Sequence, residues 1–247
     1  MRNLTAAGLI FVIVPIILAQ GATASTEEMQ ALPAAEQVLE RYIEAVGGRE
    51  TIASLTTRVS LGRMIHDLHW SRPPYEVVPI AGYATSSDHM LMVEHKSGGV
   101  RCEGFDGETA WVQDASGIAV SESPVRSKTA WLLDPQGALR MEKYFPGLEV
   151  TSKENLDGRT VYVIEPAELD RAHYALYFDA ETGLLVRVGY YWELKDYRDV
   201  DGVRLPFRID MSRKGGSSTI VLDFVKHNLP LDKPLFAVPD GAEATGE

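Results

Sequence analysis

The sequence predicts a mainly β (α+β) fold, built as an antiparallel sheet with a few short helices. Apolar residues occupy every second position over 184–194, 205–211 and 220–224. Because successive side chains of a strand point to opposite faces, this spacing predicts three long strands with one apolar face each. Asp-Gly and Gly-Gly pairs separate many of the apolar runs, which is typical of hairpins. Helical spacing is confined to two stretches, so helices are expected to cover the sheet rather than to form the fold.

The first predicted helix follows Pro33, a residue that suits the first turn of a helix. Apolar residues then recur at helical spacing from Val38 to Val46, and Gly47-Gly48 ends the helix. A short second helix is expected over 49–55. Both helices are expected to be packing elements.

The middle of the chain is a succession of short predicted strands. Val59, Leu61 and Ile65 share one side of the first strand, over 59–65. Further strands are expected over 75–83, 88–95, 100–105, 109–113, 118–121, 148–152, 160–165 and 174–178. Residues 127–145 differ, because their apolar spacing predicts two short helical pieces broken at Asp134-Pro135.

The N-terminus has the features of a secretory signal. Arg2 precedes an apolar stretch over 4–19, and Ala22-Thr23-Ala24 forms a small-x-small cleavage site. Residues 1–24 are therefore expected to be removed, with no stable membrane insertion of the mature chain. Residues 25–239 are expected to form one domain, and 240–247 a disordered tail.

The net charge limits the classes of binding partner, and the cysteine content bears on the cellular compartment. The formal net charge is −11, which argues against nucleic acid and anionic lipid surfaces as partners. Cys102 is the only cysteine, so an internal disulfide is excluded. An exported protein without disulfides suits a bacterial periplasm.

Several motifs in fixed order resemble those of the outer-membrane lipoprotein-sorting (LolA/LolB-like) superfamily, in its exported branch. They include 44–50 before the first strand, 104–107 with Ala110-Trp111, 176–184, 196–207 and the ending over 226–239. The resemblance covers nearly the whole mature chain. It implies an open antiparallel β half-barrel whose concave apolar face is partly filled by short helices, and either the binding of lipoprotein acyl chains or the sensing of mislocalised lipoproteins and envelope stress. The carrier's cavity arginine is not assigned to a position of this sequence, and no receptor-type lipid anchor is expected.

The apolar row of the last strands is the candidate ligand-binding wall. Its residues would form either a cavity wall for a lipid tail or an ordinary core, since both draw on the same residue types. They are Leu184, Val186, Val188, Tyr190, Trp192, Leu194, Phe207, Ile209, Leu222 and Phe224.

The broken helical stretch is the candidate lid over such a cavity, because Asp134-Pro135 and Gly137 weaken it as a rigid helix. Methionine and aromatic residues suit an adaptable plug, although they also suit a core. The candidate lid residues are Trp131, Leu132, Met141, Tyr144 and Phe145.

Neither a metal site nor a catalytic motif is predicted. His66 and His69 would lie on opposite faces of a strand, and His89 and His95 are six residues apart, too far along a strand for one ion. His173 and His227 are expected at the surface. The charge-rich stretch 193–199 could support proton transfer, but it equally fits the solvated end of a strand.

Three function classes follow. The first is a periplasmic carrier that binds lipid or lipoprotein acyl chains, without cofactor, metal or covalent chemistry. The second is a non-enzymatic envelope sensor or scaffold with a plugged cavity, which would bind an envelope protein through a sheet edge or through 193–199. The third is an enzyme whose site lacks a recognisable motif.

Overall fold

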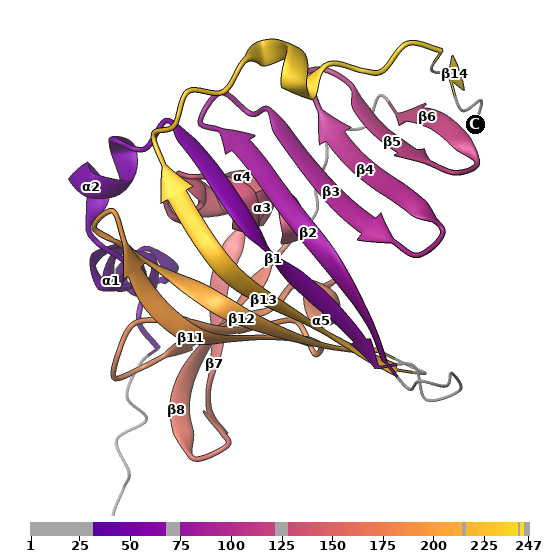
Figure 1. Cartoon of the computed structure of the whole chain (residues 1–247). Helices are drawn as coiled ribbons and strands as arrows, with labels where there is room; N and C mark the ends of the chain where they lie inside the picture. Colours follow the sequence, from indigo (N-terminus) through magenta and orange to yellow (C-terminus); the bar gives the residue numbers. More distant parts are fainter. Residues whose placement is uncertain (1–31, 68–74, 122–127, 214–215, 242, 245–247) are drawn as a thin grey trace, which may run out of the picture. The chain divides into compact units, whose positions relative to one another are not determined.

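A curved, mostly antiparallel sheet dominates the computed structural model, which describes residues 32–67, 75–121, 128–213, 216–241 and 243–244. All of them belong to the compact unit Leu32–Glu247. The strands follow the order β14-β6-β5-β4-β3-β2-β1-β13-β12-β11-β10-β9-β8-β7. Among the described strands β14 and β7 stay at opposite ends of this order, so the sheet is an unclosed half-barrel (Figure 1). The predicted fold class is confirmed.

The strand bounds agree with most of the predicted ranges. The first half of the sheet contains β1 (Thr57–Asp67), β2 (Tyr75–Thr85), β3 (Met90–Lys96), β4 (Gly99–Phe105), β5 (Ala110–Asp114) and β6 (Gly117–Ser121). The second half contains β7 (Leu148–Leu156), β8 (Arg159–Pro166), β9 (Leu176–Asp179), β10 (Leu185–Val188), β11 (Trp192–Val200), β12 (Val203–Arg213) and β13 (Gly216–His227). In the tail predicted to be disordered, Glu243–Ala244 forms β14, parallel to β6.

Short helices lie inside the curve of the sheet. Two of them, α1 (Ala35–Ala45) and α2 (Arg49–Ala53), are the predicted N-terminal pair. The predicted break at Asp134-Pro135 separates α3 (Lys128–Leu133) from η1 (Gly137–Arg140) and α4 (Met141–Tyr144). Two further short helices lie elsewhere in the chain. The helix α5 (Arg171–Tyr174) connects β8 to β9, and η2 (Lys233–Phe236) follows β13 near the C-terminus. We call residues 128–145 the lid segment; Figure 1 shows α3 and α4 within the concave side.

Two apolar clusters fill the concave side. One joins α1, α2 and the lid segment to β7–β11, and the other joins α3 to β2, β3, β12 and β13. Leu132, Tyr144, Trp192 and Leu205 pack against both clusters. The lid segment therefore bridges the two halves of the sheet.

The prediction of one strand over 184–194 is wrong. The chain turns at Gly189, which has a φ of 58°, and β10 pairs with β11 as a hairpin in which Val188 lies opposite Trp192. The positive φ suits glycine and ends the extended backbone. Tyr190 lies in this turn and is 59% exposed.

The face of β13 also changes along its length. The register with β1 shifts between Leu61 and Gly62, so Leu222 and Val225 are buried whereas Phe224 is 45% exposed. A bulge inserts one residue and reverses the alternation beyond it. Phe224 thus points away from the concave side, opposite Leu61, which is exposed as well.

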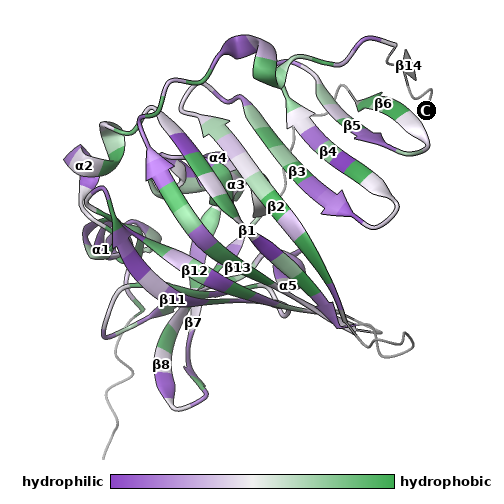
Figure 2. Cartoon of the chain, viewed as in Figure 1, coloured by the Kyte–Doolittle hydropathy of each residue, from purple (hydrophilic) through white to green (hydrophobic). Residues whose placement is uncertain are grey.

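The convex side of β2–β6 has an apolar cluster of its own. Phe236, from the C-terminal segment, packs with Leu91 and Trp111, and the Trp111 indole N–H donates a hydrogen bond of 3.1 Å to the Phe236 carbonyl. The C-terminal segment runs above these strands in Figures 1 and 2. No described helix is long and apolar enough to span a membrane.

Candidate functional site

A hollow of about 520 Å³ lies between the two halves of the sheet. Its apolar lining comes from β1, β3, β11, β12 and β13, in the form of Met64, Met92, Trp192, Met211 and Ile220. Ligand pockets occupy roughly 300–1,000 Å³, so this space is large enough for a small organic molecule. Unbranched methionine side chains adapt easily to a variable apolar ligand.

The acidic and basic residues that line this space, which we call the outer hollow, all lie on β3 and β4, while His66, Ser212 and Ser218 add polar groups from β1, β12 and β13. Glu94 and Lys96 share one face of β3 with Met90 and Met92, while Arg101 and Glu103 lie beside them on β4. We call these four charged residues the rim. Along β3 the face therefore changes from apolar to charged, and the outer hollow is amphipathic.

A smaller inner cavity of about 40 Å³ continues from the outer hollow. It shares Met92, Trp192 and Ile220 with that hollow, and adds Ile80, Ile209 and Leu222 from the sheet. Leu132 and Leu133 of α3 line its remaining side. The lid segment thus occupies the space into which the outer hollow would otherwise extend.

Gly82 on β2 permits this close approach of the lid. A Cβ at Gly82 would lie 2.5 Å from Cδ2 of Leu133 and would have to displace it. Only a residue without a side chain lets Leu133 rest directly on the strand.

Arg58, on β1, is hydrogen-bonded to the backbone of the lid segment. Its side chain is buried, and its Nη1 donates a hydrogen bond of 2.6 Å to the carbonyl of Leu132, while its Nε donates one of 3.0 Å to the Ser60 hydroxyl. Burial lowers the pKa of Arg58 to about 10, so the guanidinium remains charged at neutral pH. A charged donor to a backbone carbonyl at low dielectric is one of the stronger kinds of hydrogen bond.

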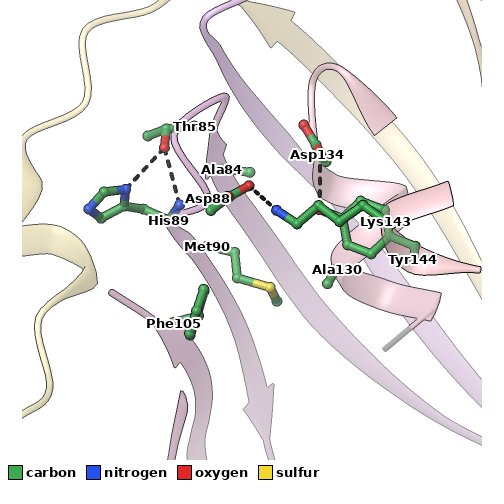
Figure 3. A pocket seen from close by; sticks show the side chains of 10 residues that line it. All are labelled: Ala84, Thr85, Asp88, His89, Met90, Phe105, Ala130, Asp134, Lys143 and Tyr144. Atoms are coloured by element: carbon green, nitrogen blue, oxygen red, sulfur yellow. Dashed lines mark hydrogen bonds and ion pairs between the residues drawn. The ribbon is translucent and has the colours of Figure 1, made fainter. Parts of the chain in front are cut away.

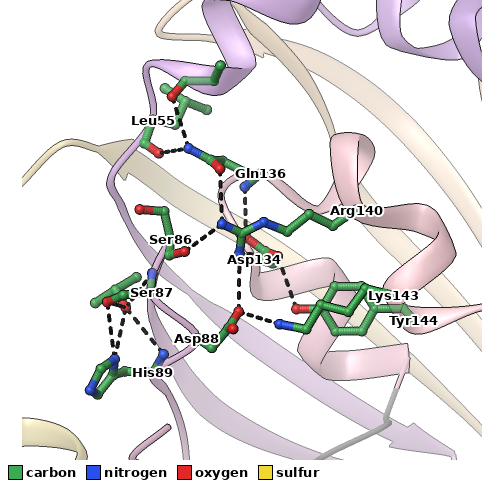
Figure 4. A network of polar contacts seen from close by, with 12 residues as sticks. Leu55, Ser86, Ser87, Asp88, His89, Asp134, Gln136, Arg140, Lys143 and Tyr144 are labelled. Atoms are coloured by element: carbon green, nitrogen blue, oxygen red, sulfur yellow. Dashed lines mark hydrogen bonds and ion pairs between the residues drawn. The ribbon is translucent and has the colours of Figure 1, made fainter.

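Arg140 ties the other end of the lid segment to the turn between β2 and β3. Its guanidinium donates hydrogen bonds to the Ser86 carbonyl (2.5 Å), Gln136 Oε1 (3.0 Å), Asp88 Oδ1 (3.1 Å) and Asp134 Oδ2 (3.2 Å). Figure 4 shows these groups converging between the turn and the lid segment. Lys143 adds an ion pair to Asp88.

Asp134 is the buried carboxylate of this network. It accepts hydrogen bonds from the Tyr144 hydroxyl at 3.0 Å and from the backbone N–H of Gln136 at 2.8 Å. Burial raises the pKa of Asp134, and burial together with the adjacent Asp134 raises the pKa of Tyr144. A side pocket of about 190 Å³ lies beside this network, between α3–α4 and β2–β4 (Figure 3).

Two solved structures share this architecture. A DUF1329 family protein from Desulfovibrio piger aligns over 82% of this chain and 96% of its own, with a TM-score of 0.55 and 13% sequence identity. A LolA superfamily protein from Nitrosomonas europaea aligns over 83% of this chain and 98% of its own, with a TM-score of 0.56 and 14% identity. The protein has a LolA-like fold. No protein-family model and no curated protein matches its sequence.

The LolA-like half-barrel brings only part of the predicted wall together. Trp192 lines both the outer hollow and the inner cavity, and Ile209 and Leu222 line the inner cavity. Val188, Leu194 and Phe207 are buried in the two concave clusters, with Leu184 partly buried against one of them. Val186 packs in a separate cluster with Val161, Val163 and Tyr177. Tyr190 and Phe224 are exposed elsewhere.

The predicted lid residues all lie in the half-barrel's core. Trp131, Met141 and Phe145 are buried, and Leu132 and Tyr144 pack between the two clusters. Of these five, Leu132 lines the inner cavity and Tyr144 the side pocket. Their role as a movable lid remains a prediction.

Sequence reasoning did not identify Arg58, Gly82 or the rim of the half-barrel as site residues. Val59, Leu61 and Ile65 form the more apolar side of the first strand, but that side is convex, and Arg58 and Ser60 face the interior. Met64 lies on the same side of β1 as Arg58 and Ser60, because the bulge opposite Gly62 inserts its extra residue in β13, and Met64 therefore joins the concave lining. The feature that could have pointed to Arg58 is its charge near the beginning of an otherwise apolar strand. Such a feature is weak evidence, because charged residues are common at strand ends.

The prediction that His227 lies at the surface is wrong. His227 is buried opposite Arg58 on the neighbouring strand, and its Nδ1 lies 3.3 Å from Asp201 Oδ2. His173 is exposed, as predicted. His69 lies outside the described residues, and among those described no three His, Cys, Asp or Glu side chains are grouped as metal ligands.

The charge-rich stretch 193–199 forms surface ion pairs. Lys195 lies 2.6 Å from Glu193 and 3.0 Å from Asp210, and Arg198 lies 2.6 Å from Asp196. A hydrogen bond from Lys195 lowers the pKa of Glu193. Each of these carboxylates therefore stays ionised and is a poor general base at neutral pH.

Proposed function

We propose that this protein binds the acyl chain of a lipid or lipoprotein on its concave face, as a non-enzymatic carrier of the periplasm. The observation that carries the proposal is the shared lining of two spaces. Met92, Trp192 and Ile220 border both the outer hollow and the inner cavity that α3 fills. Movement of α3 would join them into one slot, mostly apolar between Arg58 and Ser60 at its inner end and the charged rim at its outer end.

The energetics favour a hydrocarbon ligand in such a slot. Burial of each methylene contributes about 0.8 kcal/mol, so a dozen enclosed methylenes would contribute on the order of 10 kcal/mol. A ligand would also displace Leu132 and Leu133 and expose some of their apolar surface. This opposing term keeps binding reversible, which a carrier needs.

The attachments of the lid segment support a segment that can open as a unit. Arg58 and Arg140 hold it through a few polar contacts, and Asp134-Pro135 interrupts its helical backbone. The buried side chains of Trp131, Met141 and Phe145 also hold the segment, so a ligand would have to replace part of their apolar contacts. The signal-like N-terminus supports the periplasm as the compartment.

The experiment is uptake of a fluorescent fatty acid by the purified mature chain, together with native mass spectrometry for co-purified lipid. Trp192→Glu places a charge where both spaces meet and should abolish uptake. Met64→Glu changes the lining of the outer hollow alone, and should weaken uptake in the same direction. Circular dichroism verifies that each variant is folded.

Tyr190→Glu is the matched control, because Tyr190 is an exposed aromatic of the same predicted row. It should bind like the unmodified chain. Uptake that survives both Trp192→Glu and Met64→Glu would show that this face is not the site. Absence of lipid and of uptake in the unmodified chain would favour the second class, an envelope interaction module.

A further inference from the structure

We propose that the ligand carries a zwitterionic phospholipid headgroup, with its phosphate and ammonium held at the rim of the outer hollow. This inference rests on the proposed function, because it concerns the polar end of the same amphiphile. It follows from the four charged side chains on β3 and β4, which acyl-chain binding alone does not require.

The rim contains two cations and two anions in alternation. Lys96 Nζ lies 2.7 Å from Glu94 Oε2, and Arg101 is paired with Glu103. Glu94 also lies directly opposite Arg101 in the register of β3 and β4. The four formal charges cancel, and each is within reach of a partner of opposite sign.

The two central charges of the rim are the less exposed ones. The Glu94 side chain is 16% exposed and that of Arg101 28%, whereas Lys96 and Glu103 at the ends are 38% and 40% exposed. A partly buried carboxylate that loses its cation suffers a larger desolvation penalty than an exposed one. Any ligand that takes a cation from the rim must therefore replace it.

An anionic headgroup fails this requirement. Its phosphate would compete for Lys96 or Arg101 and leave a rim carboxylate without a partner. A purely cationic headgroup fails because it would compete for Glu94 or Glu103 and leave a rim cation without a partner. A phosphate joined to an ammonium by a short linker replaces both partners at once, since the phosphate takes the cations and the ammonium takes the carboxylates.

The position of the rim fits the polar end of an acyl-chain ligand. The shared face of β3 runs from Met90 and Met92 to Glu94 and Lys96, so the tail would lie toward the inner cavity and the headgroup at the rim. Tyr191 and Trp192 line the same hollow. Their rings offer a face for an ammonium without N–H donors.

The test measures binding of monomeric lysophospholipids with one identical acyl chain, carrying phosphoethanolamine, phosphocholine or phosphoglycerol. The proposal predicts that at least one zwitterionic lipid binds about tenfold or more tightly than the phosphoglycerol lipid, the ratio that one charge-assisted hydrogen bond supplies. Preference for phosphoethanolamine would assign the ammonium to the carboxylates, and preference for phosphocholine to the aromatic rings.

The double variant Glu94→Gln with Glu103→Gln leaves the two rim cations without carboxylates. It should reverse the preference toward phosphoglycerol. The matched control is Glu149→Gln with Glu168→Gln, which changes the net charge equally at exposed positions of the second half of the sheet, and it should keep the original preference.

Equal binding of all three headgroups, or an anionic preference in the unmodified chain, would overturn this inference and leave acyl-chain binding intact. Binding of a free fatty acid without any lysophospholipid would do the same. A chain that takes up neither class would overturn the proposed function as well.

Discussion

Arg58 shows how the role of a single residue depends on the pairing of its strand. It is 5% exposed, yet it is charged, and its partners are the Leu132 carbonyl and the Ser60 hydroxyl. A buried guanidinium is tolerated only where hydrogen bonds replace water. The Leu132 carbonyl supplies one of them, so the packed position of α3 and the buried charge stabilise each other.

Gly82 gives a direct test of lid closure at the residue scale. In Gly82→Ala the new methyl group would displace the end of the Leu133 side chain, since the Cβ position is 2.5 Å from Leu133 Cδ2. We expect a loss of stability of about 1–3 kcal/mol, typical of overpacking, together with faster ligand uptake. Urea unfolding and stopped-flow fluorescence measure the two effects.

Gly98→Ala is the control for this substitution, because a Cβ at Gly98 would meet no atom within 4 Å. It should leave both stability and uptake rate unchanged. Slower uptake in Gly82→Ala would argue against α3 as the element that moves.

His227 predicts a dependence of stability on pH. Burial, and to a smaller extent Arg58, lower its pKa from 6.5 to about 4, against the opposing effect of Asp201. The unfolded chain therefore binds a proton at a pH where the folded chain does not. The contribution of His227 to the free energy of unfolding is therefore fully present above pH 6.5. It is lost as the pH drops toward 4, by up to about 3 kcal/mol.

His227→Gln removes this titration and isolates its contribution. Urea unfolding at pH 4.5 and 7.5 should give a smaller difference in the variant than in the unmodified chain. The carboxylates with lowered pKa, such as Asp201 and Asp210, lose their contribution at lower pH. An unchanged difference between the two pH values would rule out His227 as its source.

At the scale of elements, Arg140 supplies most of the polar contacts that hold the lid segment, beside its packing in the two apolar clusters. Its contacts reach the β2–β3 turn through Ser86 and Asp88, and η1 through Gln136 and Asp134. Arg140→Ala should therefore release α3, η1 and α4 together. We expect backbone amides of residues 128–145 to exchange at least about tenfold faster with deuterium, because hydrogen bonds to charged groups contribute about 1.5–3 kcal/mol.

Arg159→Ala is the comparison variant, since Arg159 is exposed and lies 4.0 Å from its partner Asp179. Exposed pairs of this kind contribute little to stability, so exchange in the lid segment should not change. Faster exchange across the whole sheet in Arg140→Ala would indicate global destabilisation instead of lid release.

At the scale of the whole molecule, the half-barrel is covered on both sides. Helices fill the concave side, and the C-terminal segment covers the convex side of β2–β6 through Phe236, which is 1% exposed. Phe236→Ala should cost about 3–5 kcal/mol, as is typical for a buried phenylalanine. Thermal or urea unfolding measures this loss.

The neighbouring Leu235 is the matched control, because it is 38% exposed. Leu235→Ala should lower the unfolding free energy far less, within about 1 kcal/mol. Equal losses for the two variants would contradict the role of Phe236 as the anchor of the segment.

The sequence predicted the short strands, the N-terminal helices and the break in the lid segment because these depend on local patterns. It failed at 184–194, where the apolar alternation continues through the turn at Gly189 and hides it. It failed also at Phe224, because a bulge between two strands far apart in sequence reverses the alternation. Trp192 begins the strand after the hairpin, Ile209 lies on the regular β12, and Leu222 precedes the bulge in β13, so local alternation placed these three residues correctly.

The sequence by itself determined the fold class, because alternation, turn residues and helical spacing are properties of neighbouring positions. Which side of each strand faces the interior was decided by the tertiary structure, through register shifts at Gly62 and the hairpin at Gly189. The pairing of β1 with β13 placed Arg58 on the inner side beside Leu132, and the pairing of β3 with β4 gathered the rim of Glu94, Lys96, Arg101 and Glu103 on one face. The physical reason is that the alternation of side chains along a strand is a local property. Which of the two alternating sets faces the interior depends instead on pairing with strands elsewhere in the chain.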